Sequence, residues 1–308
     1  MSRHVLPLLA ALACAGPRGG AGPAPEPVAA GRARVVSLPE TLPPGLSGLA
    51  WLPDGRLLAV SERAGQVVLL DPTGVSAPEV RPVSGVPDGL DLEAVAHLGG
   101  DRVALGTESH DPGRSVDVVL LGTIGPGGVA VSQAIDLAWA PFGIRPSPNR
   151  GVEAVCMAGG TLVAVAEEVG SASGRRFAPV WLRDLSGGPV QTARLLLSSE
   201  EGKVSGLSCR PGPDHEVVLT AIERHYATRR LVSWVLPIDG TEPVAPERVL
   251  DLQGAMGERS LNPEGLALDP AGGAWIVSDN DHGGVSGPAM LVHLPPGGDR
   301  SSGQTPGP

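Results

Sequence analysis

Acidic side chains recur at two fixed places in a pattern that the chain repeats five times. A short segment of the type Glu-Ala-Val or Ser-Gly-Leu comes first, and a strand-like run that ends on an acidic residue follows it. In three repeats both places are acidic, which gives the pairs Glu93 and Glu108, Glu153 and Glu167, and Glu264 and Asp279. In the other two repeats the first place is Ser47 or Ser205, and the runs end in Glu62-Arg63 and Glu223-Arg224. The repeat therefore places carboxylates at equivalent points of successive structural units.

Carboxylates gathered around one opening cannot all stay ionised in a cleft of low dielectric constant without compensation. Hard cations are the natural compensation, and calcium accepts roughly six to eight oxygen ligands in loose geometry. The sequence therefore predicts a calcium site whose candidate ligands are Glu62, Glu93, Glu108, Glu153, Glu167, Glu223, Glu264 and Asp279. The alternative is a solvated rim whose acids face water and bind nothing specific.

Basic side chains accompany the acids near the same opening: Arg63, Arg150, Arg224 and Arg259. Beside calcium, their planar guanidinium groups would suit an anionic oxygen ligand such as phosphate, whereas salt bridges to the neighbouring acids are the alternative. A histidine follows an acid by two or three residues at His110, His225 and His282. Because these three fall in different repeats, we interpret them as surface side chains and do not expect zinc.

The elements that must position the acids are short strands joined by tight turns. Gly (44) and Pro (32) are abundant, and no long helical pattern accompanies them. In the first repeat we expect strands over 48–52, 56–62, 66–70 and 79–83, separated by turn signals such as Pro53-Asp54-Gly55. The other repeats follow the same order, so each one reads as a small antiparallel sheet.

The two ends of this region complete each other. The fifth repeat has only three expected strands, at 264–268, 274–279 and 289–294, whereas 34–38 is a strand without a repeat. We expect 34–38 to complete the fifth sheet and close a ring, because closure removes exposed edges. The prediction is an all-β fold, a β-propeller of five four-stranded blades closed by the N-terminal strand, with six blades as the alternative. In such a ring the first strand of each blade lines the channel, and the two acids of a repeat meet at one rim.

Composition excludes several classes of function. The net charge is −10 and the pI about 5.2, which argues against a nucleic-acid-binding surface. Neither a G-x-S-x-G nor an H-E-x-x-H motif is present, so nothing supports a serine hydrolase or a zinc protease of those types. Gly125–Gly128 lies in an expected hairpin turn and opens no helix, so it is not a nucleotide-binding loop.

The ends of the sequence indicate export. Residues 1–14 resemble a signal peptide or lipoprotein leader: Val5–Ala13 is apolar but too short to span a bilayer, and Cys14 follows a small-residue cleavage pattern. We expect a flexible linker over 15–31, the propeller over 32–295 and a disordered tail over 296–308. The expected location is therefore periplasmic, secreted or lipid-anchored through Cys14, with no transmembrane helix. For Cys156 and Cys209 we favour buried small hydrophobes over a disulfide, since they belong to different repeats.

Several short motifs resemble the phytase-like family of secreted bacterial β-propellers, often described as having esterase-like activity. The matching stretches are Asn149-Arg150-Gly151-Val152-Glu153-Ala154, Ala164-Val165-Ala166-Glu167-Glu168, Ala221-Ile222-Glu223-Arg224, Asn262-Pro263-Glu264-Gly265-Leu266-Ala267 and Trp275-Ile276-Val277-Ser278-Asp279-Asn280-Asp281. The resemblance implies a calcium-rich central cleft and hydrolysis of phosphate or other esters. True β-propeller phytases have six blades and lysine-bearing phosphate clefts, and this chain departs from both features, with Lys203 as its only lysine.

The function that follows is a calcium-dependent hydrolase of a small anionic ester or phosphoester. Metal-activated water would attack the ester, Glu153 or Glu264 would take the proton, and Arg150 and Arg224 would stabilise the developing charge. The first alternative is a non-catalytic ligand- or protein-binding scaffold, possibly a lipoprotein, and the second is a lactonase-like enzyme on the same fold.

Overall fold

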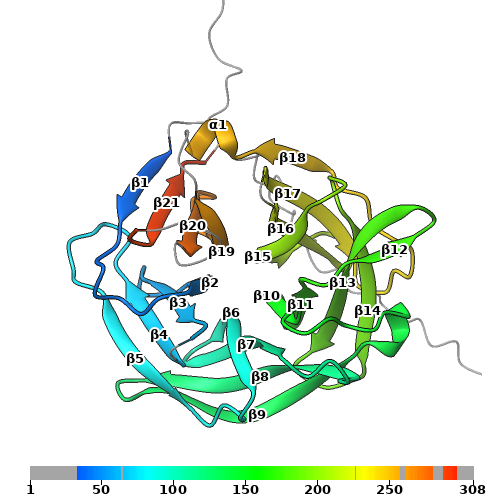
Figure 1. Cartoon of the computed structure of the whole chain (residues 1–308), viewed down its shortest axis with the longest axis horizontal. Helices are drawn as coiled ribbons and strands as arrows, with labels where there is room; N and C mark the ends of the chain where they lie inside the picture. Colours follow the sequence, from blue (N-terminus) through cyan, green and yellow to red (C-terminus); the bar gives the residue numbers. More distant parts are fainter. Residues whose placement is uncertain (1–32, 64, 226, 257–260, 280–286, 297–308) are drawn as a thin grey trace, which may run out of the picture.

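The structure, a computed structural model, describes residues 33–63, 65–225, 227–256, 261–279 and 287–296. Strands arranged around a central axis make up most of it (Figure 1). The helical elements in these residues are the 3₁₀ helix η1 (Ala140–Phe142) and the short α-helix α1 (Gln253–Met256). No helix in these ranges is long and apolar enough to cross a bilayer. The predicted all-β propeller fold is confirmed.

All the described strands belong to five units, which we number 1 to 5 in chain order. Each unit is an antiparallel sheet whose first strand lies nearest the axis and whose last strand lies outermost (Figure 1). Units 1 and 2 contain β2 (Leu46–Trp51), β3 (Leu57–Ser61), β4 (Gln66–Leu70), β5 (Glu79–Ser84), β6 (Leu90–Gly99), β7 (Arg102–Ser109), β8 (Val116–Gly125) and β9 (Gly128–Ala138). Unit 3 contains β10 (Val152–Ala158), β11 (Thr161–Ala166), β12 (Gly170–Ala172), β13 (Arg175–Asp184) and β14 (Val190–Leu196). Units 4 and 5 contain β15 (Lys203–Pro211), β16 (Glu216–His225), β17 (Thr228–Pro237), β18 (Arg248–Asp251), β19 (Asn262–Leu268), β20 (Ala274–Asp279), β21 (Met290–Leu294) and β1 (Arg34–Ser37).

The N-terminal strand closes the ring as the sequence predicts. β1 pairs antiparallel with β21, from Arg34 opposite His293 to Ser37 opposite Met290. The last sheet of the ring is therefore built from both ends of the described chain. This arrangement covers the edge of β21 that an open array would leave exposed.

Contacts between the outer strands join neighbouring units, which the sequence did not reveal. β5 and β9 pair in parallel, so units 1 and 2 form one eight-stranded sheet. A Cβ atom on Gly128 would lie 2.1 Å from the carbonyl oxygen of Pro82, so only glycine permits this approach. Units 3 and 4 are joined by a parallel bridge between Leu195 and Val244. The fourth strand of unit 4 is limited to the four residues of β18, and Val244 lies outside it.

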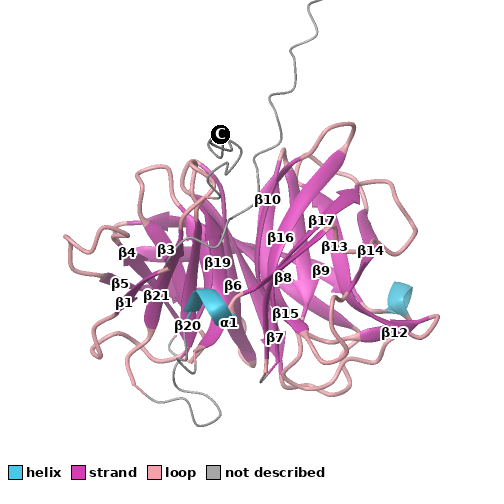
Figure 2. Ribbon diagram, turned by 90° about the horizontal axis from the view of Figure 1, so that it is seen from above, coloured by secondary structure: helices cyan, strands magenta, loops and turns pink. Residues whose placement is uncertain are grey.

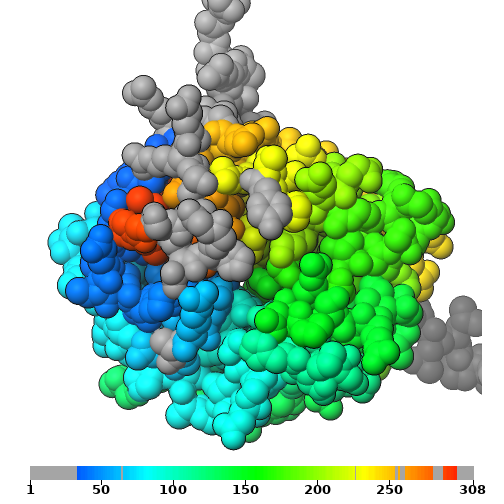
Figure 3. Space-filling view, in the orientation of Figure 1, coloured from blue at the N-terminus to red at the C-terminus, as the bar shows by residue number. Residues whose placement is uncertain are grey.

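The hydrophobic core lies between the units and not at the axis. Five clusters of buried apolar side chains occur in the described residues, one between each pair of neighbouring units. Leu105 belongs to the cluster between units 1 and 2, Trp181 to the next, Trp234 to the one between units 3 and 4, and Ile276 to the one between units 4 and 5. Seen from the side, the sheets stand next to one another around the ring (Figure 2), and in the space-filling view units 1 to 4 meet around the centre of its face (Figure 3).

Cys156 and Cys209 form a disulfide, so the expectation of two separate buried thiols is wrong. They lie on β10 and β15, the innermost strands of units 3 and 4, and their Cα atoms are 5.7 Å apart. Innermost strands of neighbouring units converge at the axis, so two residues from different repeats can lie side by side there. The disulfide links units 3 and 4 across a separation of 53 residues.

Candidate functional site

The innermost strands are all interrupted at the same place, where the first residues of the repeated pattern lie. The antiparallel register shifts around Glu93, Glu153, Ser205 and Glu264, and around Gly48 directly after Ser47. Such β-bulges redirect a side chain away from its regular position in the sheet. We call Ser47, Glu93, Glu153, Ser205 and Glu264 the inner ring.

A second set of residues comes from the ends of the neighbouring strands. In every unit, one residue directly follows the pairing partner of the residue just before the inner-ring residue; in unit 1, for example, Glu62 follows Ser61, the partner of Leu46. We call these residues, which are Glu62, Glu108, Glu167, Arg224 and Asp279, the outer ring. The two rings together form the mouth of the central channel, and they bring together seven of the eight carboxylates expected there.

The eighth predicted carboxylate, Glu223, does not lie at the mouth. Glu223 pairs with Val204, so it stands where the other units have Ser61, Thr107, Ala166 or Ser278, one residue before the outer ring. Its carboxylate is fully buried and accepts hydrogen bonds from the backbone N–H of Ser198, at 2.8 Å, and from the Ser199 hydroxyl. Glu223 therefore fixes the loop before β15, and unit 4 contributes Arg224 to the mouth in place of an acid.

The carboxylates of the mouth are buried and face one another. Glu93 is 4% exposed and Glu153 6% exposed. Burial, reinforced by neighbouring carboxylates, raises the pKa of both side chains well above the usual range. Burial followed by the charges of Glu264, Asp279 and Glu108 raises the pKa of Glu62 to about 8.

Glu108 and Glu93 lie close enough to hydrogen-bond with each other. The backbone N–H of Gly151 also donates to Glu108, and both hydrogen bonds lower its pKa. Burial and the charge of Glu167 outweigh them, so that the pKa of Glu108 is raised. A Cβ atom on Gly151 would lie 2.6 Å from the Cα atom of Glu108, so glycine is needed for this approach.

Two cations compensate one side of the mouth. Arg224 donates from Nε to Glu264 at 3.0 Å and also from Nη2, while Asn262 donates to Glu264 at 2.6 Å. Burial raises the pKa of Glu264 to about 7 although Arg224 lowers it. Burial opposes the charge on Arg224, but Glu264 and Glu153 raise its pKa nonetheless. On the same side, the ammonium of Lys203 forms an ion pair with Glu167.

The two serines of the inner ring form hydrogen bonds with backbone carbonyl groups. Each innermost strand pairs on one side only, so its other edge faces the axis with unpaired backbone groups. The Ser47 hydroxyl donates to the carbonyl of Glu93 at 2.6 Å, and the Ser205 hydroxyl donates to the carbonyl of Pro263 at 2.9 Å. Both hydroxyls thus satisfy buried acceptors of the next unit, a role that sequence reasoning missed.

The loop before β10 places Arg150 at the rim. Buried Arg114 donates to the carbonyl of Ser147 at 2.9 Å, and Glu168 accepts the Ser147 N–H at 2.8 Å. Burial raises the pKa of Glu168, but the hydrogen bonds from Ser147 and Val169 outweigh it and lower the pKa overall. The side chain of Arg150 is 45% exposed and its guanidinium lies 3.8 Å from Glu168, so it is more exposed than Arg224, the other predicted catalytic arginine.

The remaining basic side chains take different places. Arg63 lowers the pKa of Glu62 by its charge. His110 lies 2.9 Å from Asp91, and His225 lies 3.5 Å from Glu201, so neither histidine joins a cluster with another. Arg259 and His282 lie outside the described residues.

The side chains of the mouth are of the chemical type that binds calcium, but their present arrangement does not form a complete site. Within the described ranges, no three acidic, histidine or cysteine side chains converge on one point that could hold an ion. However, the groups that face one another are carboxylates, and Glu153 has no hydrogen-bond or ion-pair partner among the described residues. Oxygen donors with uncompensated charge suit a hard cation. Binding one would require carboxylates of the two rings to rotate toward each other.

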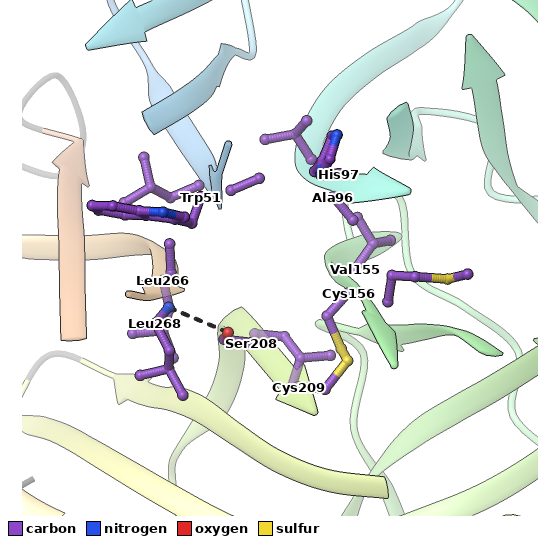
Figure 4. A pocket seen from close by; sticks show the side chains of 15 residues that line it. Trp51, Ala96, His97, Val155, Cys156, Ser208, Cys209, Leu266 and Leu268 are labelled. Atoms are coloured by element: carbon purple, nitrogen blue, oxygen red, sulfur yellow. Dashed lines mark hydrogen bonds between the residues drawn. A yellow bond between two sulfur atoms is a disulfide. The ribbon is translucent and has the colours of Figure 1, made fainter. Parts of the chain in front are cut away.

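Past the two rings, a cavity of about 170 Å³ is lined by all five innermost strands (Figure 4). One layer of its wall has only small side chains: Ala50, Ala96, Cys156, Ser208 and Ala267. The disulfide lies in this wall, and the backbone N–H of Leu268 donates to the Ser208 hydroxyl at 3.3 Å. His97 also lines this cavity, whereas the carboxylates, Arg224 and Lys203 lie at the mouth.

The raised pKa values predict how stability depends on pH without calcium. An acid whose pKa is higher in the folded state stabilises the fold at low pH, and this stability is lost as the pH rises through the folded value. We therefore expect the melting temperature in chelator to fall by several degrees between pH 5 and pH 8.5, because Glu264 and Glu62 lose their protons near pH 7 and 8. Melting followed by circular dichroism at several pH values measures this, and the Glu62→Gln variant should show a smaller fall. A melting temperature that stays level or rises over this window would contradict the expectation.

No protein-family model matches the sequence, and no curated protein matches it. Among solved structures, the chain is similar to an exo-β-1,3-galactanase from Phanerochaete chrysosporium, with a TM-score of 0.52 and 10% identity over 86% of this chain and 64% of that one. It is also similar to the PQQ-bound aldose sugar dehydrogenase of Streptomyces coelicolor, with a TM-score of 0.43 and 16% identity over 87% and 99% of the two chains. A third similarity is to a streptogramin B lyase, with a TM-score of 0.40 and 11% identity over 85% and 98%. At these identities the similarity concerns the fold alone.

Proposed function

We propose that this chain is an exported β-propeller that binds calcium at its acidic mouth and hydrolyses a small anionic ester or phosphoester there. The observation that carries the proposal is the facing of buried Glu93, Glu153 and Glu264 with the carboxylates of the outer ring. The leader pattern of residues 1–14, with Cys14 as the candidate lipid attachment point, supports export. The short motifs that resemble the phytase-like family support ester chemistry.

The calcium ion would be held by Glu62, Glu93 and Glu108. These carboxylates lie in units 1 and 2, and neither Arg224 nor Lys203 contacts them. When bound, calcium would stabilise negative charge on an ester oxygen as a Lewis acid. The other predicted ligands lie around the same mouth, near the two cations. They are Glu153, Glu167, Glu264 and Asp279.

Glu153 is the better placed of the two candidate proton acceptors. Its carboxylate has no partner among the described residues, whereas Glu264 is engaged by Arg224 and Asn262. The raised pKa of Glu153 makes its ionised form a stronger base than a free carboxylate, so in that form Glu153 can take a proton from a water molecule that attacks the substrate. Glu264 instead orients Arg224, whose Nη1 is not used in that pair. Arg224 would donate to the anionic oxygens of the substrate from Nη1, and Arg150 would approach from the rim.

Hydrolysis measurements test this proposal. The purified protein should be assayed on a panel of carboxylic esters, phosphate monoesters and diesters and lactones, in calcium and in chelator. We expect turnover of at least one anionic ester class and a loss of roughly 100-fold or more on chelation. No turnover in any class, or turnover that chelation leaves unchanged, would overturn the proposal. Turnover of lactones alone would favour the lactonase-like alternative.

One observation favours a second candidate, a non-catalytic propeller that binds a ligand or a protein. Arg224 and Lys203 already neutralise acids of the mouth, and the described side chains form no ready-made metal site. For such a scaffold, the rings would serve to hold units 3, 4 and 5 together. It predicts no turnover and a melting temperature that millimolar calcium does not change.

A further inference from the structure

Lys203 is the only lysine in the sequence, and it lies at the mouth. All the other basic residues among the 23 Lys and Arg are arginines, including those in the ion pairs on the outer surface. Lys203 begins β15, and its position opposite Arg224 in the register places the two side chains next to each other. Its side chain is 20% exposed, and its ammonium contacts Glu167 of unit 3.

The charges of the mouth are therefore distributed unevenly. Between units 3 and 5, the two cations of unit 4 face the carboxylates of Glu153, Glu167 and Glu264. Like charges directly opposite each other across two strands repel, so the pairing of Lys203 with Arg224 depends on these acids. Arg224 holds Glu264 through two nitrogens, whereas Lys203 makes a single contact from a flexible stem.

Glu153 provides an independent sign that this side can accept a ligand. Its carboxylate is 6% exposed and has no hydrogen-bond or ion-pair partner among the described residues. The charges of Glu167, Glu264 and Arg224 all act on it, which places it between the two ion pairs. Two carboxylates and one guanidinium surround this charge, so a cation that reached Glu153 would offset the repulsion that the single Arg224 leaves.

We propose that Glu153 and Glu167 form a second cation site of the mouth and that the Lys203 ammonium occupies this site as a built-in competitor. A divalent cation such as calcium is the ligand class, because its donors would be carboxylate oxygens. Lys203 limits the mouth to the ion at units 1 and 2 and leaves the unit 3 side to the protein's own amine. Removal of the charge on Lys203 opens the second site. This inference rests on the acidic mouth of the proposed function but does not require hydrolysis.

Calcium binding by the full chain tests the inference. Equilibrium dialysis with radioactive calcium gives the number of ions bound to the wild-type protein and to Lys203→Gln, Lys203→Arg and the double variant Lys203→Gln/Glu167→Gln. We expect Lys203→Gln to bind one ion more than the wild type. Lys203→Arg keeps the charge and should match the wild type, and the double variant should lose the added ion because a ligand is gone.

The outcomes separate the inference from the proposed function. If the wild type binds no calcium and Lys203→Gln binds one ion, the inference stands and the proposed function fails. If Lys203→Gln binds the same number of ions as the wild type, the inference is overturned, whether or not the wild type hydrolyses esters. Acetylation of Lys203 in the folded wild-type protein, verified by mass spectrometry, removes the same charge and must add the same ion even if the variant folds poorly.

Discussion

Replacement of Glu153 by glutamine is expected to lower the kcat of ester or phosphoester hydrolysis by about 10²–10⁴-fold, the range usually lost with a general base. Glutamine keeps the shape of the side chain but cannot accept the proton from water. The fold should survive, because removal of a buried carboxylate that lacks a partner relieves repulsion with Glu167 and Glu264. We therefore expect a melting temperature in chelator equal to or above that of the wild type.

Single-turnover kinetics on the best substrate of the panel, together with thermal melts, measure both effects. Glu247→Gln is a matched control, because Glu247 is exposed beside the outer strand β18. An unchanged kcat in Glu153→Gln would remove Glu153 from the mechanism. A lower kcat accompanied by a large fall in melting temperature would instead point to a structural role.

Loss of the disulfide between Cys156 and Cys209 is expected to cause the largest change in stability. The bond closes a loop with a sequence separation of 53 residues. The chain-entropy model gives about 4 kcal/mol for a loop of this length. Because about 1 kcal/mol shifts the melting temperature of a large domain by roughly 2–4 °C, we expect a fall on the order of 10 °C. The effect should be visible both on reduction and in the Cys156→Ser/Cys209→Ser variant.

Differential scanning calorimetry of the oxidised, reduced and double-serine proteins measures this fall. Cys14→Ser is the control for the substitution itself, and it should leave the transition where it is. If the oxidised and reduced proteins melt within about 2 °C of each other, units 3 and 4 are held by their packing and the disulfide contributes little.

The overall fold could be read from the sequence because one pattern recurs in every unit. Turn signals such as Pro53-Asp54-Gly55 and the unmatched strand near Val35 were enough to predict sheets in a ring closed by the N-terminus. The parallel pairing of β5 with β9 could not be predicted, because it depends on Gly128 approaching Pro82 and leaves no periodic signal. The pattern of side chains predicts where the strands lie, but it does not predict which outer strands pair with each other.

The sequence predicts the candidate site in outline, and the two errors have separate causes. Glu223 was aligned with Glu62 because both precede an arginine, whereas the register aligns Glu62 with Arg224. Residues next to each other in a strand point to opposite faces, so this shift of one residue changed an acid of the mouth into a cation. The omission of Lys203 has a different cause, since its partner Glu167 lies in another unit and the repeat pattern does not report contacts between units.

The disulfide shows what the one-dimensional pattern omits. Cys156 and Cys209 belong to different repeats, and the sequence pattern alone does not show that two repeats meet there. The innermost strands converge at the axis, and β10 and β15 come within disulfide distance there. This convergence determines which residues of neighbouring units touch. The sequence of a single repeat carries no information about it.

The proposed function depends on calcium binding to the carboxylates of units 1 and 2, which titration calorimetry on the full chain measures. The comparison is between the wild type and Glu62→Gln/Glu93→Gln/Glu108→Gln, which keeps side-chain size but removes the proposed ligands. We expect saturable calcium binding by the wild type and none by the triple variant, although both proteins fold. Absence of binding by the wild type at millimolar calcium, or equal binding by the triple variant, would contradict it.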